Sequence, residues 1–186
     1  MSARDVIANL RELAALTSTA DGAQRLAWGP VWREARQWFN GKLATLDLRP
    51  EIDAAGNSWV TLPGASGRTV IIGSHLDSVP NGGWLDGALG MMAGFEALRL
   101  FKDTPPPVTI KVVDWADEEG ARFGRSLLGS SAFAGTHTID ADRGRTDKDG
   151  IRLEDALRRC GVEIDRFPEK SSGCPWCKPR RDAFQR

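Results

Sequence analysis

Five side chains in two short stretches of this sequence could bind a divalent metal ion. His75 and Asp77 are two residues apart, Asp86 comes soon after them, and Glu118 and Glu119 are adjacent. An imidazole together with carboxylates suits an ion of the zinc, manganese or cobalt type. A bound cation would also offset the repulsion among acids that lie close together.

The chemistry of these groups indicates a role for each. His75 would be a ligand, and Asp77 could accept the other ring N–H and fix the tautomer of the imidazole. Asp86 has two oxygens and could bridge two metal ions. Because adjacent side chains point in different directions, one of Glu118 and Glu119 can bind metal while the other faces substrate. The free glutamate would act as general base on water activated by the metal.

The elements around these residues predict that they meet. Residues 69–74 (TVIIGS) and 108–113 (VTIKVV) form apolar, β-branched runs typical of strands buried on both faces, and residues 87–101 between them favour a mostly buried helix. This order predicts a βαβ unit with parallel strands and a right-handed crossover. The candidate residues then lie at the carboxyl edge of the sheet, where open α/β folds bind ligands.

Further elements are predicted on both sides of this unit. Helical periodicity covers residues 6–16 and 31–48, and SWVTL at 58–62 alternates like a short strand. Two more helices are expected near 126–134 and 151–160, the second ending at a glycine. Together these elements indicate an α/β fold.

The composition argues against several classes of partner. The chain has 186 residues with 25 basic and 25 acidic side chains, so its balanced charge gives no general argument for nucleic acid or an anionic membrane as partner. No apolar run approaches the roughly 18 residues of a membrane span, and the charged N-terminus is unlike a signal peptide. We therefore expect a cytoplasmic protein of one domain, or of one domain and a fragment of a second.

Two segments resemble a known family. GSHLDSVPNGGWLDGALG at 73–90 and DWADEEGARFGRSLLGSSAFAG at 114–135 are similar to the dinuclear zinc-peptidase superfamily. EEGARFG and GSSAFAG point to its amidase/hydantoinase/carbamoylase branch, which includes N-carbamoyl-L-amino-acid hydrolases, allantoate amidohydrolases and β-ureidopropionases. The resemblance implies a three-layer α/β/α catalytic domain with a mostly parallel sheet.

The resemblance also implies a role for each candidate residue. His75 would bind one metal ion, Glu119 the other, and Asp86 would bridge the two, while Glu118 would be the catalytic base and Asp77 would orient His75. The cofactors implied are two divalent metal ions, zinc or manganese. The implied reaction is hydrolysis of a non-peptide C–N bond in a small carbamoyl, ureido or amidine substrate, by an enzyme that is a homodimer in the family.

The resemblance extends only to about residue 168. Residues 1–168 are therefore predicted to be the N-terminal part of the catalytic domain, and residues 169–186 a divergent, disordered tail. Family members continue with further ligand histidines and a lid and dimerisation domain, which this chain lacks. We expect a truncated hydrolase that is inactive alone. The alternative is a non-catalytic fragment or an interaction module that pairs with a separately encoded remainder.

Other residues with reactive side chains carry weaker signals. His137 lies in a polar stretch and is predicted to be a surface residue. Cys174 and Cys177 form a CxxC pair, which is compatible with half a zinc site or a thiol module. The only other cysteine, Cys160, gives a zinc site three ligands at most, so we interpret the pair as a chance occurrence.

Overall fold

The computed structural model describes residues 3–167, and its centre is a four-stranded sheet in the order β3-β4-β6-β5. The strands are β3 (Glu51–Ile52), β4 (Ser58–Leu62), β5 (Thr69–Ser74) and β6 (Thr109–Asp114). β5 and β6 are parallel, whereas β6–β4 and β4–β3 are antiparallel. The α/β class and the parallel βαβ unit are confirmed, but within residues 3–167 the sheet is mixed rather than mostly parallel, because β4 enters it without a crossover helix.

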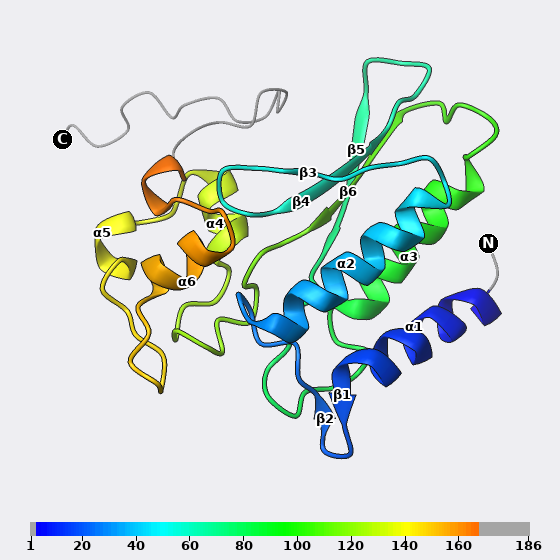
Figure 1. Cartoon of the computed structure of the whole chain (residues 1–186). Coiled ribbons are helices and arrows are strands. Elements are labelled where there is room, and N and C mark those ends of the chain that lie inside the picture. Colours follow the sequence, from blue (N-terminus) through cyan, green and yellow to red (C-terminus); the bar gives the residue numbers. More distant parts are fainter. Residues whose placement is uncertain (1–2, 168–186) are drawn as a thin grey trace.

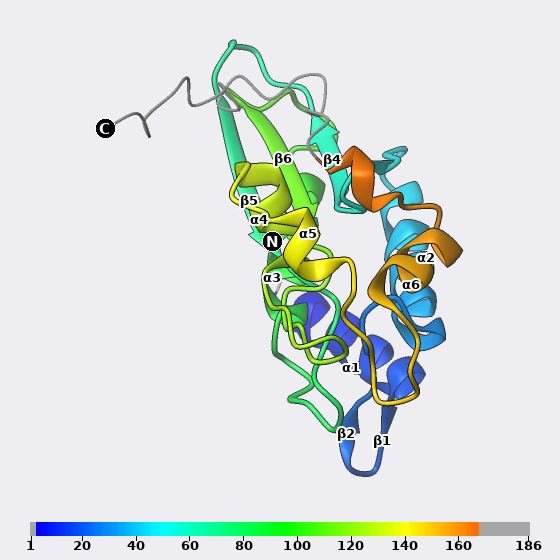
Figure 2. The ribbon, with the colours of Figure 1, turned by 90° about the vertical axis from the view of Figure 1, so that its left-hand side faces the viewer.

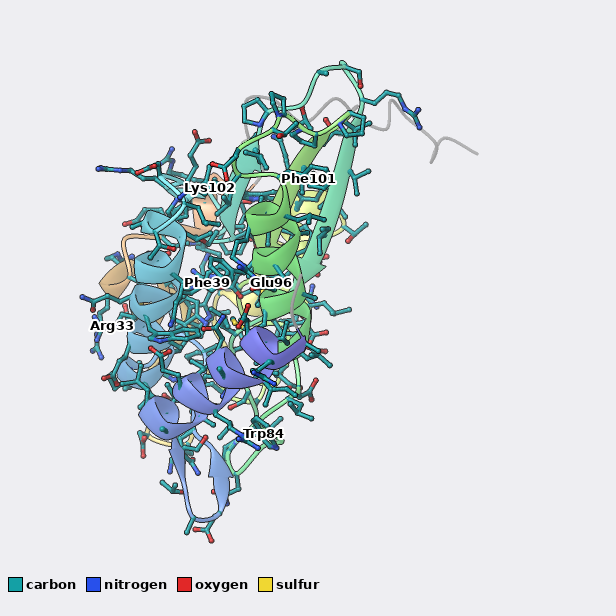
Figure 3. All side chains as sticks on the ribbon, turned by 90° about the vertical axis from the view of Figure 1, so that its right-hand side faces the viewer. Arg33, Phe39, Trp84, Glu96, Phe101 and Lys102 are labelled. Carbon is teal, nitrogen blue, oxygen red and sulfur yellow. The ribbon has the colours of Figure 1, made fainter. Side chains whose placement is uncertain are left out.

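Three helices lie on one face of the sheet (Figure 1). They are α1 (Ala3–Thr17), α2 (Pro30–Ala44) and the crossover helix α3 (Ala88–Leu100). The apolar core between them and the sheet includes Val60, Ile110 and Val112 from alternate strand positions. Figure 3 shows Phe39 of α2 on the side facing α3, where its ring lies 6.3 Å from that of Phe95. This packing holds α3 in position, so its first residues lie beside the edge of the sheet.

The opposite face carries the shorter helices (Figure 2). These are α4 (Leu128–Ala134), α5 (Ile139–Asp142), α6 (Leu153–Arg159) and the 3-10 turn η1 (Ile164–Arg166). Phe133 of α4 packs on Trp59 and Trp115, at centroid distances of 5.0 and 5.4 Å. Helices therefore cover both faces of the sheet, as the predicted three layers require.

The helix predicted over 31–48 ends earlier, at Ala44. Asp47 has a left-handed φ of 57°, and the N–H of Leu48 bonds back to the carbonyl of Leu43 at 3.2 Å, which closes the helix in a Schellman-type turn. The turn keeps Leu46 and Leu48 packed against the core without further helix. The expected helix stop at Gly161 is confirmed by its φ of 76°.

Strand β5 differs from the prediction of a strand buried on both faces. Val70 is 49% exposed and Ile71 39% exposed, although their side chains point to opposite faces. The reason is that β5 is the edge of the sheet in the described residues and has a neighbour on one side only. Its apolar sequence therefore borders solvent.

The hairpin of β1 (Ser18–Thr19) and β2 (Gly22–Ala23) was not predicted. It reverses the chain after α1 and returns it beneath the loop that follows β5, where Ala23 and Gly82 form a bridge. Among residues 3–167, no helix combines the length and apolar character needed to cross a membrane. The predicted 169–186 tail and the Cys174/Cys177 pair lie outside the described residues.

Candidate metal centre

The structure brings His75, Asp86 and Glu119 together at the carboxyl edge of the parallel pair. One donor atom from each of these side chains lies within 4.8 Å of the others. His75 follows β5, Asp86 stands just before α3, and Glu119 follows β6. The loops after β5 and β6 and the start of α3 therefore meet at this edge of the sheet, as the sequence predicts.

Asp86 reaches the cluster through a tight turn. The carbonyl of Asp86 accepts the N–H of Ala88 at 2.6 Å, a γ-turn centred on Gly87, whose φ of 64° and ψ of −48° suit glycine. The turn leaves the Asp86 side chain 64% exposed, with one oxygen 3.9 Å from His75 Nε2. Its second oxygen is available to another partner, as a bridging ligand requires.

Glu118 also faces the imidazole. Its Oε2 lies 3.6 Å from His75 Nε2, and its side chain is partly exposed. It is therefore beside the three clustered donors and open to solvent, which is the position needed by a base that acts on a small substrate.

Asp77 lies beside the ring of His75 and also connects two loops of the site. His75 Nδ1 lies 3.1 Å from the backbone carbonyl of Asp77 and 3.5 Å from its carboxylate. The carboxylate also accepts the backbone N–H groups of Glu118 and Glu119, at 3.3 and 3.1 Å. This buried acid links the loop after β5 to the loop after β6.

The electrostatics of the cluster favour a cation. Burial raises the pKa of Glu119, and Asp86, Asp77 and Glu118 raise it further against the attraction of His75. Burial alone would lower the pKa of His75, but Asp77 and Glu118 outweigh it and raise the pKa to about 9. Glu119 Oε1 is buried and has no hydrogen-bond partner in the described residues. A divalent ion would provide that partner and neutralise the acids, so the residues fit a metal ion.

Several supporting residues were not predicted. Asp114 ends β6, and its carboxylate accepts the N–H of Leu76 at 2.8 Å and Arg36 Nε at 2.6 Å. Its position at the end of a strand would have identified it by the same argument that found Glu118. Arg25 and Trp28 also contact the ligand-bearing loops, but no local pattern in the sequence marks them.

His137 is not the predicted surface residue. Its side chain is 4% exposed, its ring packs on Phe167 at 5.0 Å, and Nδ1 lies 3.5 Å from the carboxylate of Asp142. A polar stretch is no guide here because α5 and the end of the described chain fold over the imidazole. His137 lies outside the His75, Asp86 and Glu119 cluster.

Comparison with known proteins decides the family. Residues 57–153 match the model of peptidase family M28, which is more than half of the chain. The chain belongs to peptidase family M28. All five candidate residues lie within the matched residues 57–153.

The relatives of this M28 chain include named amidohydrolases. An N-carbamoyl-L-amino-acid amidohydrolase of Rhizobium meliloti is 36% identical over 82% of the chain, and an allantoate amidohydrolase of Escherichia coli is 35% identical over 80%. A hydantoinase/carbamoylase family amidase from Burkholderia ambifaria has a similar structure, with a TM-score of 0.80 and 33% identity over 88% of the chain. The chain spans 38%, 37% and 42% of the length of these three proteins.

Proposed function

We propose that this chain is the metal-binding part of a hydrolase that cleaves non-peptide C–N bonds in small N-carbamoyl or ureido compounds. The observation that carries the proposal is the cluster of His75, Asp86 and Glu119, with Glu118 at its open side. The names of the amidohydrolase relatives support the substrate class. Residues 1–168 would then be one part of a catalytic domain, as the sequence predicts.

The resemblance implies a role for each residue, and the geometry of the cluster is compatible with these roles. His75, Asp86 and Glu119 would hold two divalent ions, zinc or manganese, with Asp86 as the shared ligand that the resemblance implies. The ions would supply Lewis acidity, which polarises the substrate carbonyl and lowers the pKa of water. Glu118 Oε2 would accept the proton of the attacking water and deliver it to the departing nitrogen. Asp77 would keep both glutamates in place through their backbone N–H groups.

The ligand count predicts how the chain behaves alone. Within residues 3–167 each ion would have one terminal ligand and the shared Asp86, whereas catalytic zinc sites have about three protein ligands. We therefore expect metal binding without measurable turnover of N-carbamoyl amino acids or allantoate by the chain alone. Appreciable turnover that a Glu118→Gln variant abolishes would contradict this expectation.

A chimera tests the proposed reaction. The aligned 160 residues of the Rhizobium meliloti relative would be replaced by the corresponding residues of this chain, and release of amino acid from N-carbamoyl substrates would be measured. We expect turnover that falls by roughly 10²–10⁴-fold in the Glu118→Gln chimera. A Glu34→Gln chimera, altered at an exposed position of α2, serves as control. A folded, metal-loaded chimera without activity on carbamoyl substrates or allantoate would overturn the proposal.

A second candidate function, an interaction module, is favoured by the exposed edge. Val70 and Ile71 border solvent on β5, and Leu89 and Leu100 do so on α3, at 48% and 55% exposure. We propose as its occupant a separately encoded α/β polypeptide that adds a strand to β5. Co-expression with the part of the Rhizobium relative beyond the alignment should yield a complex, and Ile71→Lys should abolish it. If the parts do not associate, or if Ile71→Lys associates normally, this candidate fails.

A further inference from the structure

Residues 23–28 lie against both loops that carry the candidate ligands, although they are distant from them in sequence. We call these residues the 23–28 segment. Ala23 exchanges two backbone hydrogen bonds with Gly82, at 2.9 and 3.1 Å, in the loop between His75 and Asp86. Arg25 and Trp28 then contact the loops after β5 and β6 in turn. One short stretch of chain thus touches both halves of the metal centre.

Arg25 fixes the loop after β5 through three hydrogen bonds. Its Nε donates to the carbonyl of Leu76 at 2.6 Å, its backbone N–H donates to Ser78 Oγ at 3.0 Å, and its carbonyl accepts the N–H of Ser78 at 3.0 Å. Leu76 stands between His75 and Asp77, and its N–H is bound by Asp114. The guanidinium of Arg25 and the carboxylate of Asp114 therefore bind the two peptide groups of Leu76. His75 and Asp77 on either side of it cannot rotate without breaking these charge-assisted hydrogen bonds.

Trp28 fixes the loop after β6. Its Nε1 donates to Asp117 Oδ2 at 2.8 Å, and Asp117 directly precedes Glu118 and Glu119. Trp28 and Asp117 have φ angles of 60° and 54°, which are unfavourable for residues other than glycine. Such conformations persist where the surrounding structure enforces them. The bond joins two strained positions and so sets the direction in which the glutamates leave the turn.

The burial of Arg25 supports a role in binding the loop after β5. Its side chain is fully buried, and burying a guanidinium is costly unless its bonds repay the lost hydration. Thr17 Oγ1, at 3.4 Å, is its only other hydrogen-bond partner in the described residues. An apolar side chain could fill the same space, but it would leave the carbonyl of Leu76 without this donor.

We propose that Arg25 and Trp28 are positioning residues of the metal centre, which hold His75 and Glu119 at ligand distance by clamping their loops to the 23–28 segment. The inference rests on the metal centre of the proposed function and adds to it a part of the chain outside the ligand-bearing loops. A residue near the metal centre can affect the protein in two ways. A merely structural residue changes stability, whereas a positioning residue changes the affinity and the coordination of the metal in the folded protein.

The test uses the full chain with Co²⁺ and Zn²⁺ as probes. Zinc affinity is measured by isothermal titration, and coordination by the visible absorption of bound cobalt, for Arg25→Met and Trp28→Phe. Two controls match them: Arg33→Met removes an exposed arginine of α2, and Trp38→Phe removes an exposed Nε1–carboxylate bond that is also 2.8 Å long, to Glu12. We expect zinc affinity to fall roughly 10- to 100-fold in both test variants, with an altered cobalt spectrum, and not in the controls.

The outcomes distinguish this inference from the proposed function. If the wild-type chain and a Glu119→Gln variant bind Zn²⁺ equally weakly, the metal centre itself is wrong and the inference falls with it. If wild type binds and Glu119→Gln does not, but folded Arg25→Met and Trp28→Phe bind with wild-type affinity and spectrum, only the inference is overturned. Should Arg25→Met not fold, Ser78→Ala replaces it, because it removes one bond of the same clamp.

Discussion

Gly87 offers a sharp test of how the fold holds the metal centre. It is the central residue of the γ-turn that presents Asp86, and its φ of 64° is rarely adopted by residues with a side chain. A Cβ atom at this position would lie 2.4 Å from the carbonyl oxygen of His75 and 2.6 Å from two atoms of its imidazole. Gly87→Ala therefore strains the backbone and also pushes directly on a candidate ligand.

The expected loss of stability follows from these two effects. The unfavourable backbone conformation costs about 1–3 kcal/mol, and relieving the contact with His75 adds about 1–3 kcal/mol, because the neighbour is backbone and a buried ring. The unfolding free energy should therefore fall by about 2–6 kcal/mol. For a chain of this size each kcal/mol corresponds to about 2–4 °C, so the melting temperature should fall by roughly 4–24 °C.

Gly83→Ala provides the matched control in the same loop. Its added Cβ would find the Cβ of Asp86 at 4.0 Å as its nearest neighbour, so stability should change by less than about 0.5 kcal/mol. Thermal melts in EDTA measure the stability of each variant, and titration with Zn²⁺ measures the zinc affinity of its metal centre. We expect Gly87→Ala to lose at least about tenfold in zinc affinity. If it melts and binds like Gly83→Ala, the described turn and its contact with His75 are wrong.

Three further predictions concern single residues. Asn57 is fully buried and its Oδ1 accepts the N–H of Ala116 at 3.0 Å, so Asn57→Ala should destabilise the fold by about 1–3 kcal/mol in urea unfolding; an unchanged midpoint would contradict this. Burial lowers the pKa of His137, so below about pH 6.5 the unfolded chain binds a proton that the folded state resists, and stability falls as pH drops. His137→Phe should flatten this slope, and a slope equal to that of wild type would refute the assignment. Because Asp77 and Glu118 raise the pKa of His75 to about 9 against its burial, metal must displace a proton at neutral pH. Zinc affinity should rise about tenfold per pH unit up to about pH 9, and a flat profile between pH 7 and 9 would contradict the raised pKa of His75.

The sequence determined the local elements and the edge at which chemistry gathers. Apolar β-branched runs at 69–74 and 108–113 with an apolar helix between them define a parallel βαβ unit, because a parallel pair needs a crossover. The residues that follow two parallel strands must then meet at one edge. His75, Asp86 and the adjacent Glu118 and Glu119 could therefore be grouped from the sequence, and the family resemblance pointed to Glu119 as the ligand.

Only the tertiary structure decided which residues surround that edge. The apolar run of β5 does not reveal that one side of the strand lacks a neighbour, since burial depends on segments far away in the chain. The polar residues around His137 in the sequence likewise predicted a surface position, but α5 and Phe167 enclose its side chain. Arg25 and Trp28 reach the ligand-bearing loops across 51 and 89 positions of sequence, and no local periodicity carries such information. The pattern of apolar residues determines which helix or strand a segment can form, whereas packing between distant segments determines which residues each side chain contacts.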